Sequence, residues 1–243
     1  MRRFLIQAIK PGQQTTALDH DQSRHVRKVL RLQEGAEIEL FDGMGMIYEA
    51  VISALDRRVT VRIKAGRYCA APSPRLHLHL GLLKGKKMEF VIQKATELGA
   101  HSMTPFLSDF IDARPPKEEK MERWRKISLE ACKQCGRSWP LTISSATHLA
   151  DQLASLADHA ASLLFWENEE KRDMAGVAPP TWTGSSDIHL FLGPEGGFSQ
   201  TEVDLCREKM TAVSLGPLTL RAETAAITAL SLTLFLAGRM RHK

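Results

Sequence analysis

Apolar and polar residues alternate along three segments near the start of the chain. These segments are AEIELFDG at 36–43, MIYEAVISAL at 46–55 and RRVTVRIKAG at 57–66. A period of two residues is typical of strands with one buried face, and glycine or charged residues separate the segments as turns do. Residues 3–9 predict a further strand and residues 21–32 a helix. The N-terminal part therefore predicts a small β-rich domain.

The pattern changes after a proline-containing stretch at 69–74. Pro72 and Pro74 each lack a backbone N–H and have a fixed φ, so this stretch can extend neither a helix nor a central strand. We place a domain boundary here, with one domain over residues 1–72 and a second over residues 73–243.

Beyond the boundary, strand patterns alternate with helix patterns. We expect strands at 76–83, 102–107, 187–193 and 212–216, and helices at 87–99, 118–136 and 223–238. This alternation predicts an α/β domain in which a parallel sheet is covered by helices. Ligands of such sheets bind beyond the carboxyl ends of the strands, where the loops collect.

The last of these helices contains an almost uninterrupted apolar run, AAITALSLTLFLAG at 225–238. The run is shorter than the roughly 20 residues that a membrane span needs, and it contains Thr228, Ser231 and Thr233. We expect a buried core helix and no membrane partner.

The opening segment MRRFLIQAIKPG has no small-residue cleavage site after its apolar run, so no signal peptide is expected.

Composition narrows the class of protein further. Apolar residues make up 43% and charged residues 25%, which is close to the average for soluble globular proteins. The net charge of +5 suits a polyanionic partner, although it also suits an ordinary basic enzyme. Four cysteines in 243 residues are too few and too irregularly spaced for a disulfide framework, which indicates a reducing, cytoplasmic compartment.

The first candidate for chemistry is the stretch LFLGPEGGFSQTEV at 190–203. An apolar strand leads into a glycine-rich loop at 193–197, and a helix pattern begins at Ser199, where Ser199 and Glu202 have capping-box spacing. The loop is not a P-loop, because Phe198 follows the last glycine, and the G-x-G-x-x-G fingerprint is absent. A loop with so few side chains lets its backbone approach a flat, largely uncharged group.

The second candidate is LGPLTLRAETA at 215–225, again a strand, a glycine loop and a helix start. Arg221 and Glu223 flank the beginning of a helix that is otherwise almost wholly apolar. Charged residues at the mouth of a buried element usually have partners. A local ion pair between Arg221 and Glu223 and a role for Arg221 in binding a ligand both fit this pattern.

These two motifs, with HVRKVLR, KGKKMEFVIQKATELG and EACKQCGR, resemble the RsmE family of 16S ribosomal RNA uridine-N3 methyltransferases in the SPOUT superfamily. The resemblance covers nearly the whole chain. It implies an N-terminal PUA-like β-barrel that binds RNA, followed by a SPOUT α/β domain with a parallel sheet and a C-terminal trefoil knot. It also implies a homodimer that uses S-adenosylmethionine (SAM), and no metal, to methylate N3 of a uridine in 16S rRNA of the small ribosomal subunit.

The resemblance also implies the site residues. We expect Arg221 to stabilise the ionised uracil, and Glu223 to orient Arg221 or to accept the proton. The expected cofactor-binding residues lie on three loops: Leu164, Phe165, Glu167, Leu192, Gly193, Pro194, Glu195, Gly196, Gly197, Leu215, Gly216, Leu218, Leu220, Arg221 and Thr224. The expected RNA-binding residues are Arg24, His25, Arg27, Lys28, Arg31, Lys84, Lys86, Lys87, Gln134 and Arg137.

Within the HVRKVLR segment, Val26, Val29 and Leu30 have the spacing of one buried helix face. That spacing leaves Arg27, Lys28 and Arg31 pointing outward for phosphates, although a merely solvated helix face has the same pattern.

Other interpretations stay open at this point. A non-catalytic RNA-binding protein with a relict SAM pocket has the same two-domain pattern. An α/β enzyme for a small phosphorylated metabolite needs a phosphate cradle, which neither loop supplies. The pair Cys132 and Cys135 lacks a second ligand pair at zinc-site spacing, so we expect structural thiols there.

Overall fold

The contacts within the computed structural model divide the chain into two compact units. One unit comprises Met1–Ala71 with Leu129–Pro140, and the other comprises Pro72–Ser128 with Leu141–Lys243. The structure describes residues 2–111, 114–157, 161–177 and 187–240. No local sequence pattern indicated that residues 129–140 pack with the first unit.

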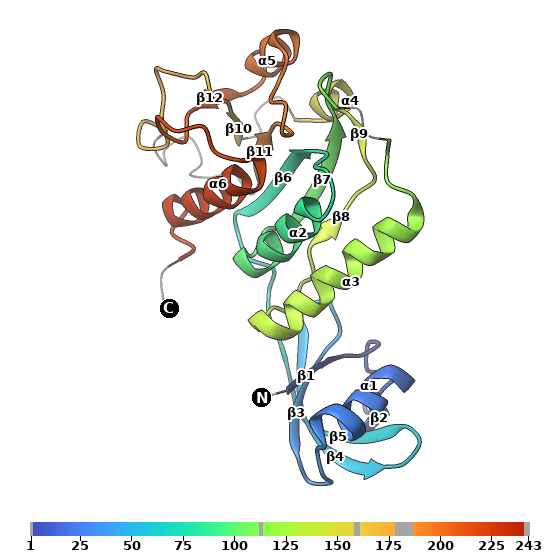
Figure 1. Cartoon of the computed structure of the whole chain (residues 1–243). Coiled ribbons are helices and arrows are strands. Elements are labelled where there is room, and N and C mark those ends of the chain that lie inside the picture. The colour runs from blue at the N-terminus through green and yellow to red at the C-terminus, as the bar shows by residue number, and fades with distance from the viewer. Residues whose placement is uncertain (1, 112–113, 158–160, 178–186, 241–243) are drawn as a thin grey trace. The chain divides into compact units, whose positions relative to one another are not determined.

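The first unit is built on a five-stranded sheet with the strand order β1-β3-β4-β5-β2 (Figure 1). Strands β1 and β3 are parallel, and the other neighbours are antiparallel. The alternating residues predicted from the sequence fill its core, where Ile38, Leu40 and Val61 are fully buried. The strands are β1 (Arg2–Leu5), β2 (Thr15–Ala17), β3 (Glu37–Phe41), β4 (Met46–Leu55) and β5 (Val59–Tyr68).

The helix predicted at 21–32 is present but has two parts, α1 (His20–Arg24) and a π-helix, η1 (His25–Leu30). Asp19 caps α1, because its side chain accepts a hydrogen bond from the N–H of Gln22 at 2.7 Å. The expected burial of Val29 is wrong: its side chain is 65% exposed, whereas Val26 is fully buried. The wider π turn, with its i→i+5 hydrogen bonds, does not keep both residues on one face.

Residues 129–140 are held in the first unit by specific hydrogen bonds. Arg3 Nη1 donates to the backbone carbonyls of Cys132 at 2.9 Å and Arg137 at 3.1 Å. Trp139 Nε1 donates to the carbonyl of Cys69 at 2.8 Å. Such contacts join segments far apart in the chain, and for that reason local sequence patterns do not reveal them.

The second unit contains a wholly parallel sheet with the order β12-β10-β11-β6-β7-β8, and β9 also pairs with β7. The predicted α/β class is therefore confirmed, while the trefoil knot stays a prediction. The strands are β6 (Arg75–Gly81), β7 (Ser102–Leu107), β8 (Thr142–Ile143), β9 (Thr147–His148), β10 (Ala161–Phe165), β11 (Asp187–Leu192) and β12 (Thr211–Val213).

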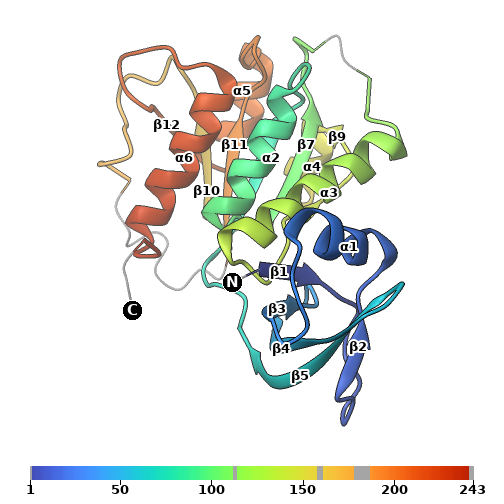
Figure 2. The ribbon, with the colours of Figure 1, turned by 60° about the horizontal axis from the view of Figure 1, so that its bottom comes forward.

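Helices cover both faces of this sheet, as Figure 2 shows. On one face α2, α6 and the first part of α3 pack on the even-numbered residues of β6 and β11, such as Leu78 and Leu190. On the other face α4 and α5 enclose Phe106, Leu164 and Phe191. The helices are α2 (Lys87–Leu98), α3 (Glu118–Cys135), α4 (Leu149–Ala154), α5 (Gln200–Arg207) and α6 (Ala222–Leu236).

Histidines occupy part of the second face, on alternate residues of neighbouring strands. His79 Nε2 lies 3.0 Å from His189 Nδ1, and His79 Nδ1 lies 2.6 Å from Gln152 Oε1. The His77 ring stacks on His189 at 4.7 Å between centroids, and His77 Nε2 contacts Asp187 Oδ1 at 2.8 Å. These polar side chains are paired with one another, which is the condition for burying them in a sheet.

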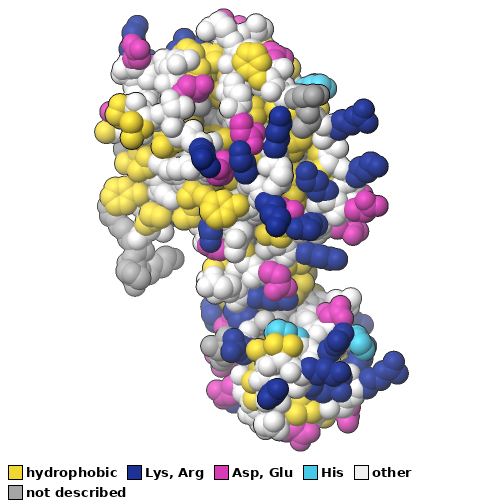
Figure 3. Space-filling view, viewed as in Figure 1, with side chains coloured by type: hydrophobic (Ala, Val, Ile, Leu, Met, Phe, Trp, Pro, Cys, Tyr) yellow, Lys and Arg dark blue, Asp and Glu magenta, His cyan; other side chains and the backbone are white. Residues whose placement is uncertain are grey.

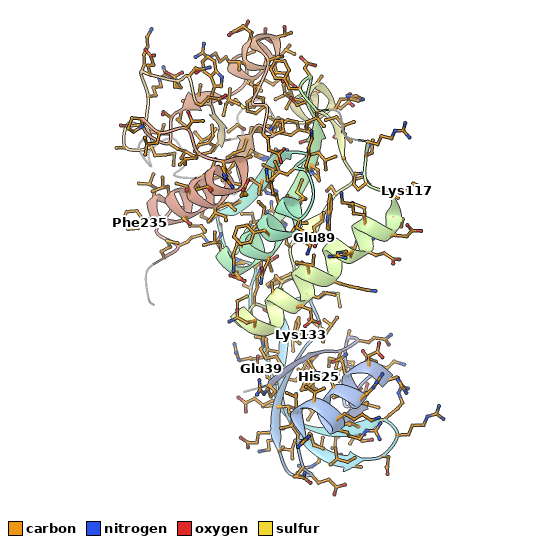
Figure 4. The ribbon with its side chains drawn as sticks, in the orientation of Figure 1. His25, Glu39, Glu89, Lys117, Lys133 and Phe235 are labelled. Atoms are coloured by element: carbon orange, nitrogen blue, oxygen red, sulfur yellow. The ribbon has the colours of Figure 1, made fainter. Side chains whose placement is uncertain are left out.

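Helix α6 is only half buried, contrary to the core helix expected from its apolar sequence. Ala226, Ala229 and Leu230 are fully buried, but Phe235 is 67% exposed and points outward from the helix (Figure 4). A helix that is apolar all round normally has protein on every side. In the part of the chain that the structure describes, no helix combines the length and apolar character of a bilayer span.

Candidate active site

A pocket of about 390 Å³ lies at the carboxyl ends of β10, β11 and β12. This position follows from the parallel topology, which brings the loops after neighbouring strands to one edge of the sheet. Its walls come from Phe165–Glu167 after β10, from the loop after β11, and from residues 214–222 before and within the first turn of α6. The volume is in the range of small-molecule sites.

The loop after β11 requires its glycines for close approach. A Cβ on Gly197, whose φ is +72°, would lie 2.6 Å from Oε1 of Glu167. A Cβ on Gly81, at the end of β6, would lie 2.4 Å from the backbone N of Pro194. The end of β6 thus packs on the backbone of this loop, and the Glu167 side chain packs against Gly197, which together fix the shape of the pocket wall.

The far end of the same loop is fixed by the start of α5. The predicted capping box is confirmed: Ser199 Oγ accepts from Glu202 N at 3.2 Å, and Glu202 Oε2 accepts from Ser199 N at 2.9 Å. The buried Glu202 carboxylate also accepts from Ser108 Oγ at 3.0 Å and from Asp109 N at 3.1 Å. This carboxylate thus ties the loop after β11 to the loop after β7.

Glu195 makes an ion pair that the sequence did not predict. Its Oε1 accepts from Lys87 Nζ at 3.0 Å and from the backbone N of Lys84 at 3.2 Å. Burial alone would raise the pKa of Glu195, but the hydrogen bonds from Lys87 and the backbone hold that pKa below its ordinary value. Glu195 is among the expected cofactor-binding residues and lines the pocket, and its carboxylate also joins the loop after β11 to the segment before α2.

Arg221 stands at the N-cap of α6 with its side chain exposed and on the pocket lining. No ion pair joins Arg221 to Glu223 within the described ranges, so the local pair considered from the sequence is absent. Glu223 Oε2 is buried and has no hydrogen-bond partner among the described residues. Arg221 is therefore available to an anion, and Glu223 has a free acceptor.

Most of the residues predicted to bind a cofactor surround this pocket: Phe165, Glu167, Leu192, Gly193, Pro194, Glu195, Gly197, Leu215, Gly216, Leu218, Leu220 and Arg221. Leu164, Gly196, Glu223 and Thr224 are not on its lining. Leu164 belongs to the core cluster on the other face of the sheet, because successive strand residues point to opposite faces.

Five lining residues were not among the predicted ones, namely Trp166, Ser214, Thr219, Ala222 and Ala225, and Lys87 was assigned to RNA instead. Arg207 stacks on the Trp166 ring at 4.8 Å from its centroid and donates to Glu169 at 2.9 Å. Trp166 could have been predicted as a lining residue, because it stands between Phe165 and Glu167, which were both predicted.

The residues predicted to bind RNA lie in both units. In the first unit Arg24, His25 and Lys28 are exposed on α1 and η1, and Arg31 is exposed at the C-cap of η1. Arg27 is half buried, because its guanidinium donates to the carbonyls of Ser23 at 3.4 Å and Arg57 at 3.3 Å. In the second unit Lys84 and Lys86 are exposed after β6.

His25 and Gln134 come together in the first unit on a second pocket, of about 580 Å³. Arg2, Arg3 and Lys133 also line this pocket, and Figure 4 shows His25 and Lys133. Arg137 lies in the same segment as Gln134, where its carbonyl accepts a hydrogen bond from Arg3.

Cysteine chemistry and metal ligation have no visible basis at either pocket. All four cysteines are free, and burial raises the pKa of Cys132 to about 11 and that of Cys206 to about 12. Among the residues that the structure describes, no cluster of three His, Cys, Asp or Glu side chains is arranged to hold a metal ion.

The fold and this pocket define an α/β domain with a ligand site at the carboxyl edge of a parallel sheet. The model of the RNA methyltransferase domain family matches residues 71–234, and that of the RNA methyltransferase PUA domain matches residues 18–64. A ribosomal RNA small subunit methyltransferase E from Rickettsia conorii is 31% identical over 88% of this chain and 86% of its own. The chain belongs to the RsmE family of RNA methyltransferases.

Two solved structures resemble the whole chain. One is a ribosomal RNA small subunit methyltransferase E from Neisseria gonorrhoeae bound to S-adenosyl methionine, with 28% identity, a TM-score of 0.87 and coverage of 97% of this chain and 98% of that one. The other is a methyltransferase from Legionella pneumophila in complex with SAM, with 32% identity, a TM-score of 0.80 and coverage of 96% of both chains.

Proposed function

We propose that this chain transfers a methyl group from SAM to N3 of a uridine in 16S rRNA of the small ribosomal subunit. The observation that carries the proposal is the pocket at the carboxyl ends of β10, β11 and β12 with the exposed Arg221 on its lining. The Neisseria relative was solved with SAM, and the Rickettsia relative is named for small-subunit rRNA.

The residues of the pocket fit SAM. The loop 192–197 and the loop 215–220 offer backbone groups with few side chains in the way, and Leu192, Leu215 and Leu220 offer apolar surface for an adenine ring. The close contact of Gly197 with Glu167 shows that the loop after β11 is shaped without room for a side chain there. When bound, SAM supplies a methyl group on a positively charged sulfonium.

Arg221 is proposed as the residue that stabilises the reacting base. Uracil N3 has no free lone pair while it is protonated, and loss of the proton spreads negative charge over N3, O2 and O4. A guanidinium presents several planar donors to such an anion, and Arg221 has no ion-pair partner within the described ranges. Glu223 is proposed to accept the proton directly or through water, since its buried Oε2 makes no other hydrogen bond among the described residues.

RNA binding is proposed for the basic surface of the first unit. Arg24 and Lys28 are exposed on α1 and η1, Arg31 is exposed at the C-cap of η1, and the exposed Arg57 and Arg58 in the turn between β4 and β5 extend this surface. Figure 3 shows Lys and Arg side chains on this unit and also over the second unit. Contacts of this kind bind phosphates without reading sequence, so they would position the RNA and leave the choice of uridine to other residues.

A homodimer is proposed through α6. Thr224, Thr228, Ser231 and Phe235 lie at helical spacing on the side of α6 that the unit does not fully bury. Apolar side chains gather on the surface over α6, as Figure 3 shows. Phe235 is 67% exposed, and a second copy of the chain packed on this surface would bury it. The cytoplasm is the proposed location, because the ribosomal substrate is assembled there.

The experiment combines transfer and binding. Purified protein is incubated with methyl-labelled SAM and either 16S rRNA or small subunits, and the modified nucleotide is mapped. We expect N3-methyluridine at one position. A non-catalytic RNA-binding protein would give no product. Thermal unfolding with SAM measures binding separately, because SAM at 100 times its Kd stabilises a protein that binds it by about 2.7 kcal/mol. No product and no thermal shift would contradict the proposed function.

A further inference from the structure

Phe110 is a large apolar side chain left on the surface beside the candidate active site. It follows β7 by three residues and is 58% exposed. A single exposed apolar residue needs no explanation in general. The surroundings of Phe110 make it informative.

The loop after β11 holds Phe110 in place. A Cβ on Gly196 would lie 3.0 Å from Cβ of Phe110 and 3.5 Å from its carbonyl oxygen, so Gly196 packs directly against this residue. The preceding Asp109 donates its N–H to Glu202 and accepts from Ser199 Oγ at 2.6 Å. The backbone of Phe110 is therefore held by Gly196 and, through Asp109, by Ser199 and Glu202, which lowers the ordering cost of presenting its ring.

A segment with exposed lysines contacts the same short stretch of loop. Glu195, the neighbour of Gly196, accepts from the backbone N of Lys84 at 3.2 Å. The side chains of Lys84 and Lys86 are exposed, and neither makes an ion pair within the described part of the chain. The ring of Phe110 packs next to Gly196, and the segment that carries Lys84 and Lys86 contacts the neighbouring Glu195 through its backbone, at the edge of the pocket.

An aromatic face beside cations is the chemistry that binds single-stranded nucleic acid, because every base can stack on a ring while its phosphates meet the cations. We propose that Phe110 stacks on a base of the RNA close to the uridine that is methylated, and that Lys84 and Lys86 bind the phosphates on either side of that base. The proposal rests on the proposed function of the pocket. It makes Phe110 a residue that positions the substrate and does not touch SAM.

The test compares four variants of the full chain: Phe110→Ala, Phe110→Leu, Phe110→Tyr and, as a control, Leu205→Ala. Leu205 is an apolar side chain on α5 that is 43% exposed. Their Kd values for 16S rRNA and for SAM are measured directly. Stacking on one base contributes enough binding that Phe110→Ala and Phe110→Leu should raise the Kd for RNA about tenfold. Phe110→Tyr and Leu205→Ala should stay within about twofold, and the Kd for SAM should not change.

The salt dependence of RNA binding distinguishes the contribution of the Phe110 ring from that of the two lysines. Lys84→Ala and Lys86→Ala should each reduce the slope of log K against log salt by about 1, whereas the Phe110 variants should leave the slope unchanged. RNA binding by Phe110→Leu equal to that of the wild type would overturn the stacking role. Weaker SAM binding in Phe110→Ala would also overturn it, since Phe110 would then act by supporting Gly196.

The outcome is independent of catalysis. Wild-type protein that binds SAM and RNA but transfers no methyl group would contradict the proposed function, and the binding comparison would still decide what Phe110 does.

Discussion

Nζ of Lys87 lies 3.0 Å from Oε1 of Glu195, so an ion pair joins the start of α2 to the glycine-rich loop after β11. Both side chains are partly exposed, at 41% and 27%, which limits the coupling to about 1 kcal/mol or less. We predict that Lys87→Met and Glu195→Gln each weaken SAM binding by no more than about fivefold. In a double-mutant cycle measured by calorimetry, the double variant should be no weaker than either single one. Strictly additive losses would mean that the two residues act separately.

Replacement of Arg221 should separate chemistry from binding. The pocket walls come from many other residues, whereas the charge that develops on uracil has Arg221 as its proposed partner. Arg221→Ala should lower kcat by about 10²–10³ and change the Kd for SAM by less than about twofold. Arg221→Lys, which keeps the charge but not the planar donors, should recover only part of the rate. The role is wrong if single-turnover transfer by Arg221→Ala matches the wild type.

Glu223 gives a sharper test because its Oε2 has no partner among the described residues. Glu223→Gln keeps the shape of the side chain but removes its capacity to accept a proton. We predict a fall in kcat of about 10²–10⁴, with unchanged SAM and RNA binding. Glu223 does not line the pocket, and a water molecule could therefore carry the proton to it. If Glu223→Gln keeps a rate within about twofold of the wild type, water or another residue removes the proton.

The exposed face of α6 predicts a change of oligomeric state. Phe235 is 67% exposed, and an aspartate there would place a charge in an apolar interface. Phe235→Asp should shift the protein from dimer to monomer in analytical ultracentrifugation, while Leu205→Ala should leave it dimeric. A wild-type protein that sediments as a monomer at all concentrations would rule out the proposed homodimer.

Elements with strong local patterns could be predicted from the sequence. The alternation in 36–66 gave three strands, and the spacing of Ser199 and Glu202 gave the capping box, because both depend only on near neighbours. The packing of residues 129–140 with the first unit was not predictable. The contacts that hold this segment come from Arg3, which is far away in the sequence. The exposure of Val29 was missed because nothing local signalled a π-helix.

In the candidate site, too, features visible in the local sequence could be predicted and contacts between distant elements could not. Both glycine loops and Arg221 could be singled out because glycines and charged residues stand out in an apolar context, and they lie on the lining of the pocket. The partner of Glu195 was missed, because Lys87 belongs to another element and only the fold brings the two together.

The contact between His79 and His189 predicts acid sensitivity of the second unit. Burial lowers the pKa of His79 to about 3, and burial together with the nearby His77 lowers that of His189 to about 4. In the unfolded chain both imidazoles would take up a proton below about pH 6.5. The unfolded state therefore binds more protons than the folded state between pH 6.5 and 4. The contribution of the two neutral histidines to stability is complete above pH 6.5 and is lost as the pH falls.

His79 alone should lower the free energy of unfolding by about 1 kcal/mol for each pH unit below 6, and His189, whose ring is less buried, should lower it by less. Urea unfolding at several values between pH 7.5 and 5 would measure the slope, and this range lies above the usual carboxylate pKa values. His79→Gln keeps a polar group for Gln152 but cannot be protonated, so it should flatten the slope; an unchanged slope would show that other groups set the acid limit.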